Sequence, residues 1–160
     1  MSEADNLKRE DNPGVKLPPP LVYGGFLILG ICFQSNWIDG NLGPRPLLIG
    51  AGAVFLIACI ATIWEAKRHH DAGTAVEPWK PTTVILDKGL YAYSRNPIYV
   101  GMILAYIAVA IGAMSYLALA LLLLVLLIIR YHVIAREEAY LERKFGDTYL
   151  NYKARVRRWI

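Results

Sequence analysis

The sequence has few cysteines, no low-complexity tract and no repeat, and it contains long stretches without charge. Its two cysteines, Cys32 and Cys59, lie inside apolar runs and lack the CxxC spacing of a metal or redox motif, so we interpret both as buried small hydrophobic residues. The first 20 residues are polar and of mixed charge, without the small-residue cleavage pattern of a signal peptide. We therefore expect the chain to begin with a polar tail, residues 1–20.

Three runs contain no Asp, Glu, Lys or Arg, at residues 17–38, 46–64 and 96–129. A helix needs about 20 apolar residues to cross a bilayer, so the first two runs fit one crossing each. The third fits two short crossings broken at residues 112–115. None shows the alternation of barrel strands, and only closed secondary structure is stable in lipid. The sequence predicts an all-α integral membrane protein with four transmembrane helices, the last two a hairpin, followed by a cytoplasmic C-terminal helical segment.

We expect one membrane domain, residues 21–160, made of two N-terminal helices (21–64), a loop (65–97), and the hairpin with its C-terminal segment (98–160). Counted in chain order, the five segments outside the apolar runs hold 3, 1, 5, 0 and 8 of the Lys and Arg residues. This alternation predicts that both termini and the long loop are cytoplasmic, in the cell inner membrane. It also accounts for the net charge of +4, so we expect no nucleic-acid partner.

The loop 65–97 is too long for a plain connector and contains aromatic and apolar residues, which favours an ordered, functional segment. Near its start, His69 and His70 are adjacent and lack further Cys or His residues at ligand spacing. We therefore predict no metal site, and interpret this pair as solvated or facing lipid headgroups.

The fourth helix continues past the membrane edge and stops near Gly146. Helical spacing places Arg130, Ile134 and Glu137 on one face. Neither Glu137 nor Glu138 has a Lys or Arg three or four residues away that could pair with it along the helix. Carboxylates next to an apolar face are expected to find a partner elsewhere, which would be Arg95 or a bound cation. The alternative is that both face water.

The tripeptide Arg95-Asn96-Pro97 has two interpretations. Pro97 fits the first turn of a helix and Asn96 can cap its free amides, with Arg95 at the membrane edge. Alternatively, the exposed helix start is an anion site for a ligand carboxylate. The tail YLNYKARVRRWI likewise favours an interfacial helix on anionic lipid, while a second role in closing a pocket stays open.

The segment GLYAYSRNPIYVG, followed by an apolar hairpin and then REEAYLERKFGDTYLNYKARVRRWI, resembles the isoprenylcysteine carboxyl methyltransferase and phospholipid methyltransferase superfamily of integral membrane enzymes. The likeness spans about residues 73–160. The matching positions are Gly89, Tyr91, Arg95, Pro97, Tyr99, Gly101, Glu137, Glu138, Phe145, Gly146, Tyr149 and Tyr152. Asn96 replaces the family's usual histidine, and an asparagine can form a hydrogen bond but does not titrate near neutral pH.

The resemblance implies that S-adenosylmethionine is the cofactor, in a cytoplasmic pocket between the last two helices and the C-terminal segment. The expected cofactor-binding residues are Gly89, Tyr91, Arg95, Asn96, Pro97, Tyr99, Gly101, Glu138 and Tyr149. We expect Glu137 and Glu138 to act as electrostatic partners of the sulfonium or of an incoming amine, and Arg130 to orient an acidic acceptor. The partners implied are membrane lipids and a lipophilic acceptor. Whether the acceptor is a carboxylate, an amine or another group stays open, as does the oligomeric state.

Three other functions compete with this one. A small four-helix transporter needs ionisable residues near mid-membrane, where the apolar runs have no Asp, Glu, Lys or Arg. A non-catalytic membrane scaffold predicts no cofactor pocket. A membrane reductase has a similar C-terminal motif on a much longer chain.

Overall fold

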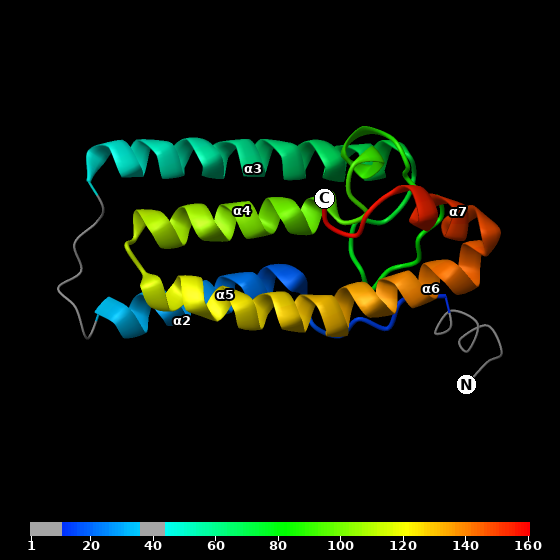
Figure 1. Cartoon of the computed structure of the whole chain (residues 1–160). Helices are drawn as coiled ribbons and strands as arrows, with labels where there is room; N and C mark the ends of the chain where they lie inside the picture. The colour runs from blue at the N-terminus through cyan, green and yellow to red at the C-terminus, as the bar shows by residue number, and fades with distance from the viewer. Residues whose placement is uncertain (1–10, 36–43) are drawn as a thin grey trace.

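The computed structural model describes residues 11–35 and 44–160, and this part of the chain is helical without a β-strand (Figure 1). The first ten residues of the predicted tail, and positions 36–43 between the first two helices, lie outside the described residues. The all-α prediction is confirmed for the rest. The elements are α2 (Pro19–Ser35), α3 (Arg45–Asp71), the 3-10 turn η1 (Gly89–Ala92), α4 (Pro97–Gly112), α5 (Tyr116–Ile128), the π-helical turn η2 (Ile129–Ile134), α6 (Ala135–Phe145) and α7 (Asp147–Arg155).

The helix ends follow local chemistry. Prolines occupy the first turn of α3 and α4, where a missing N–H costs no hydrogen bond. The predicted break at 112–115 is confirmed, and the Ser115 hydroxyl caps α5 by accepting a hydrogen bond from the Ala118 amide at 3.2 Å. The predicted stop at Gly146 is also confirmed, with φ of 51°. Helix α3, however, continues to Asp71, seven residues past the end expected at residue 64.

Two helices are long and apolar enough to cross a membrane. These are α3 and the continuous helix formed by α5, η2 and α6, residues 116–145. Helices α2 and α4 are apolar but shorter, with 17 and 16 residues. Large apolar side chains point outward from these helices, among them Leu21, Ile49, Ile60 and Leu123. A surface of this kind is suited to contact with lipid and not with water.

The cysteines belong to this outward surface. Cys32 is exposed and Cys59 is partly exposed, so the predicted burial of Cys32 is wrong. The physical reason is that a helix in lipid can carry apolar residues around its whole circumference, and an apolar run therefore does not distinguish inner from outer positions.

Small residues bring the helices together in pairs, with α3 packed on α4 and α2 packed on α5 (Figure 1). Gly30 of α2 lies against α5, and a Cβ there would be 2.5 Å from the Cα of Ala118. Gly101 of α4 lies against α3, and a Cβ there would be 2.2 Å from Oγ1 of Thr62. Close approach at small residues is how apolar helices associate in lipid, where the hydrophobic effect does not drive them together.

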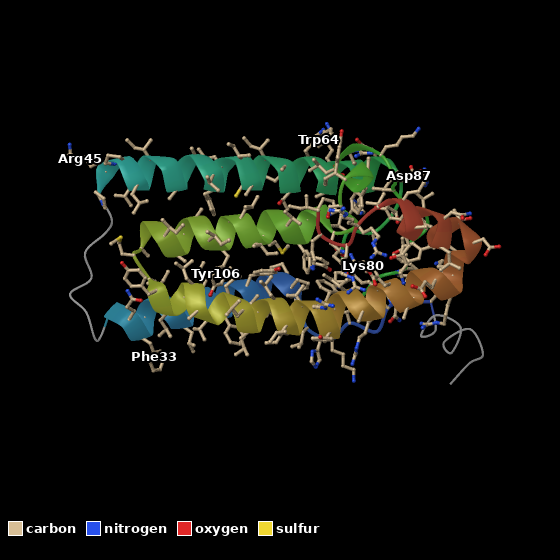
Figure 2. The ribbon with its side chains drawn as sticks, in the orientation of Figure 1. Phe33, Arg45, Trp64, Lys80, Asp87 and Tyr106 are labelled. Carbon is tan, nitrogen blue, oxygen red and sulfur yellow. The ribbon has the colours of Figure 1, made fainter. Side chains whose placement is uncertain are left out.

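The polar segments collect at one end of this bundle. Figure 2 places Lys80 and Asp87 of the long loop at this end, while Arg45 and Phe33 lie at the other. Helices α6 and α7 lie beside the loop, and the C-terminus returns toward the start of α4 (Figure 1). The fold therefore brings the loop, the start of α4 and the C-terminal segment to one place.

The packing predicts different effects at two glycines of α2. Gly30→Ala forces a methyl group onto the backbone of α5 and is expected to lower the thermal unfolding midpoint in detergent. Gly25→Ala is the matched control, because a Cβ there meets nothing within 4 Å. Alanine in place of glycine improves helix propensity by about 1 kcal/mol, so the control is expected to be neutral or stabilising. Equal midpoints for the two variants would contradict the packing.

Candidate active site

A cavity of about 200 Å³ lies at the polar end of the bundle. Its walls come from the segment before α2, the end of α3, the loop after it, η1, the start of α4, α6 and α7. Of the predicted site residues, those that line it are Tyr91, Arg95, Asn96, Tyr99, Glu137, Glu138 and Tyr149. Two segments that are far apart in the sequence, residues 91–99 and 137–149, therefore lie close together around one space.

The long loop is fixed to its neighbours by hydrogen bonds. The fully buried carboxylate of Glu65 accepts a hydrogen bond from the amide of Leu90 at 2.9 Å. Arg68 donates to the same carboxylate and to the carbonyl oxygen of Lys88, at 3.1 and 2.6 Å. Further along, the amide of Thr82 donates to the hydroxyl of Tyr140 on α6 at 3.1 Å. These bonds hold the loop as one wall of the cavity.

Three predicted cofactor-binding residues do not line the cavity. Gly89 has φ of +68°, and a Cβ there would lie 1.6 Å from Nη1 of Arg68, so glycine lets the loop close on α3. Pro97 is buried in the first turn of α4. Gly101 faces α3, as described above. All three shape the site from outside it.

A buried carboxylate, Glu138, binds two arginines, of which Arg95 lines the cavity. Glu138 is 6% exposed, and its Oε1 lies 3.2 Å from Nη2 of Arg95. Arg158 donates from Nε to Oε1 at 3.0 Å and from Nη2 to Oε2 at 2.6 Å, and these bonds raise the pKa of Arg158. The predicted partnership of Glu138 with Arg95 is confirmed, and the alternative that this carboxylate faces water is wrong.

The C-terminal residues 156–160 leave the helix and run back to the start of α4. The Arg95 amide donates to the carbonyl oxygen of Arg157 at 2.9 Å, and the Asn96 side-chain amide donates to that of Arg158 at 2.9 Å. The predicted capping by Asn96 is therefore wrong, because its amide group is directed at the tail and α4 has no side-chain cap. Only α7 of the predicted tail helix is helical, and its position at a lipid interface stays a prediction, while the last residues close one side of the site.

Arg95 keeps unused donors in this enclosure. Its side chain is 9% exposed, and Nε and Nη1 have no hydrogen-bond partner among the described residues. A guanidinium has five N–H groups, of which Nε holds one and Nη1 holds two. Buried donors without partners are rare in folded proteins, and an anionic group is their strongest partner. The cavity wall therefore fits a ligand carboxylate at Arg95.

Glu137 and the tyrosines form the other side of the cavity. The hydroxyl of Tyr99 lies 3.0 Å from both carboxylate oxygens of Glu137, and no cationic side chain of the described residues forms an ion pair with Glu137. Loss of contact with water, together with the Glu137 charge, raises the pKa of Tyr91 well above its ordinary value. Burial similarly raises the pKa of Tyr149 to about 12. Both tyrosines therefore remain neutral donors.

Arg130 lies outside the site, and the predicted face shared with Glu137 is wrong. Its side chain is exposed, with the guanidinium 5.6 Å from the ring centre of Tyr131. The cause is η2, which closes i→i+5 hydrogen bonds and contains one more residue per turn than an α-helix. One extra residue rotates everything after it by about 100°, so the i, i+7 spacing no longer describes one face.

The sequence interpretation missed several residues of the site, chiefly Glu65, His69 and Arg158. His69 is half-buried and lines the cavity, so the prediction of a solvated residue is wrong there, although His70 is exposed. The sequence did hold a signal that points toward Arg158, because Glu138 has no Lys or Arg partner along its own helix and needs one from elsewhere in the chain. Glu65 is the single acidic residue of α3 before Asp71, at the end of an apolar run.

Known proteins are similar to this chain over part of its length. The phospholipid methyltransferase family model matches residues 47–148. An uncharacterized protein of Haemophilus influenzae (strain Rd) is 41% identical over 63 residues, which cover 39% of this chain and all of that protein. No solved structure matches. The family match covers nearly all of α3, the loop, α4, α5, η2 and all of α6, and the chain belongs to the phospholipid methyltransferase family.

Proposed function

We propose that this protein is a methyltransferase with four membrane crossings that uses S-adenosylmethionine to methylate a lipophilic acceptor at the cytoplasmic face. The observation that carries this proposal is the buried Arg95, whose Nε and Nη1 donors lack partners at the wall of a cavity. The carboxylate of the cofactor's methionine part has the charge and the acceptors that these donors require.

The remaining lining residues suit the other parts of the cofactor. Glu138 positions Arg95, and Tyr91 and Tyr149 offer ring surfaces for an adenine. Glu137, which lacks a cationic partner among the described residues, offers negative charge to a cationic group. When bound, S-adenosylmethionine supplies a methyl group activated by its sulfonium. The protein's contribution is then to hold both reactants in line and to keep water out, which accounts for much of catalysis in such a transfer.

The position of the site supports a lipophilic acceptor. The cavity lies at the ends of the apolar helices α2 and α4, where a lipid headgroup and a cytosolic ligand can meet. The positive-inside bias favours four crossings, with both termini and the loop in the cytoplasm and the protein in the cell inner membrane. Partners are membrane lipids and an acceptor carrying a carboxylate, an amine or another nucleophile.

The cofactor assignment predicts the effect of Arg95→Ala. Loss of charge-assisted hydrogen bonds costs about 1.5–3 kcal/mol, so binding of labelled S-adenosylmethionine to the protein in detergent is expected to weaken roughly 10- to 100-fold. Arg143→Ala is the matched control, since Arg143 is exposed on α6 away from the cavity. Circular dichroism checks that both variants are folded. Wild-type affinity in Arg95→Ala would contradict this role for Arg95, and no binding by the wild type would contradict the proposed function.

The topology predicts how reporter fusions behave. Alkaline phosphatase is active only outside the cytoplasm, so a fusion after Met114 is expected to be active, and fusions after Gly73 and after Ile160 inactive. A fluorescent protein, which folds in the cytoplasm, is expected to show the opposite pattern at the same three positions. Active phosphatase after Ile160 would contradict the cytoplasmic position of the C-terminus.

A further inference from the structure

His69 and Tyr91 form a hydrogen-bonded pair at the cavity wall. The Nδ1 atom of His69 lies 2.8 Å from the main-chain oxygen of Glu65, and Nε2 lies 3.3 Å from the hydroxyl of Tyr91. A carbonyl oxygen only accepts, so in the neutral imidazole Nδ1 carries the ring proton and Nε2 presents its lone pair. The Tyr91 hydroxyl donates to that lone pair. The tautomer is thus fixed by the helix, with the basic nitrogen directed at a side chain of the cavity.

Two further contacts hold this pair in place. The carboxylate of Glu65 binds the amide of Leu90, next to Tyr91, at 2.9 Å. The hydroxyl of Tyr152 donates to the main-chain oxygen of Tyr91 at 2.8 Å. The two rings lie with their centres 5.3 Å apart. Glu65 therefore acts on both partners, through its main chain on His69 and through its side chain on the turn that carries Tyr91.

We propose that His69 and Tyr91 receive the proton that the methyl acceptor loses, with Tyr91 passing it to Nε2 of His69. This inference rests on the proposed function. The acceptor's N–H, O–H or S–H bond breaks, its proton binds the Tyr91 oxygen, and the Tyr91 proton moves to Nε2. The electron pair left on the acceptor forms the new bond to the methyl carbon, while the methyl–sulfur bond breaks and leaves its pair on sulfur. The imidazolium then releases the proton to water.

The pair restricts the class of acceptor. A carboxylate is already deprotonated at neutral pH and does not need a proton acceptor, whereas an amine, hydroxyl or thiol does. Asn96 cannot supply this function, because an amide does not titrate and its nitrogen is bonded to the C-terminal segment. His69 can therefore take up a proton from a group bound in this cavity. The methyl acceptor is then a nucleophile that carries a proton.

The first test reads the tautomer without any reaction. The ¹⁵N spectrum of histidine-labelled protein in detergent, assigned with His69→Gln, is expected to show Nδ1 of His69 protonated and Nε2 unprotonated and hydrogen-bonded. Tyr91→Phe is expected to shift the Nε2 signal and to leave Nδ1 unchanged. A proton on Nε2 would overturn the proposal whatever the activity.

The second test measures methyl transfer from labelled S-adenosylmethionine to a total bacterial lipid extract. General-base catalysis contributes about 10²–10⁴-fold, so His69→Gln is expected to lower kcat by about 100-fold or more while cofactor binding is unchanged. Tyr91→Phe, which keeps the ring, is expected to lower kcat similarly. His70→Gln is the control, because His70 is exposed and adjacent in sequence.

The pH profile separates a proton acceptor from a structural residue. The deficit of His69→Gln is expected to shrink as pH rises, because hydroxide then removes the acceptor's proton. The charged and titratable groups near the pair, whose own ionisation the profile must take into account, are Glu65, Arg68, Glu137 and Tyr152. A deficit constant with pH, loss of cofactor binding in both variants, or full activity in His69→Gln would overturn the proposal. Failure of the wild type to bind S-adenosylmethionine contradicts the proposed function instead.

Discussion

The site depends on one buried carboxylate, that of Glu138. Its two oxygens bind Arg95 from the segment before α4 and Arg158 from the C-terminal residues, so a single side chain of α6 joins three distant parts of the chain. Removing one partner of a buried ion pair costs about 3–5 kcal/mol, because a charge is left uncompensated. The two arginines share this carboxylate unequally. Arg158 binds both oxygens and Arg95 uses one nitrogen, which leaves Arg95 with donors for a ligand.

The π-helical turn decides which side chains of the last membrane helix reach the cavity. Through η2 the helix rotates without breaking, so the buried residues Ile129, Val133 and Ile134 pack inward before Glu137 and Glu138 arrive at the site. A regular α-helix would have carried Arg130 toward the face of Glu137. Such turns are frequent at functional sites, since they reorient a helix at the cost of weaker hydrogen-bond geometry. In this protein the π-helical turn comes directly before α6, whose residues Glu137 and Glu138 line the cavity.

The sequence predicted the helices and most of the polar side of the cavity, for physical reasons that can be named. Apolar runs, prolines and Gly146 carry local signals, and the missing helical partner of Glu138 pointed correctly to Arg95. The rotation of the helix at η2 cannot be inferred from local sequence signals, so the prediction placed Arg130 on the wrong face of the helix. The return of the C-terminal residues to the start of α4 could not be predicted either, because it depends on main-chain carbonyl oxygens, which every residue has. Gly89 and Gly101 were predicted to bind the cofactor. In the structure, glycine is needed at both positions because each lies against a side chain of α3.

Asn96 and His69 have different tasks in this cavity and belong to different elements. Asn96 lies at the junction of α4 with the C-terminal residues, and its amide binds a carbonyl there. An amide performs this task at every pH, because it cannot lose its donor by ionisation. The ionisable nitrogen lies instead on α3, whose main chain fixes the tautomer of His69. Asn96 itself does not titrate, so the hydrogen bond that it donates to the main-chain oxygen of Arg158 does not depend on its own protonation, and a change of charge at His69 occurs on a different element.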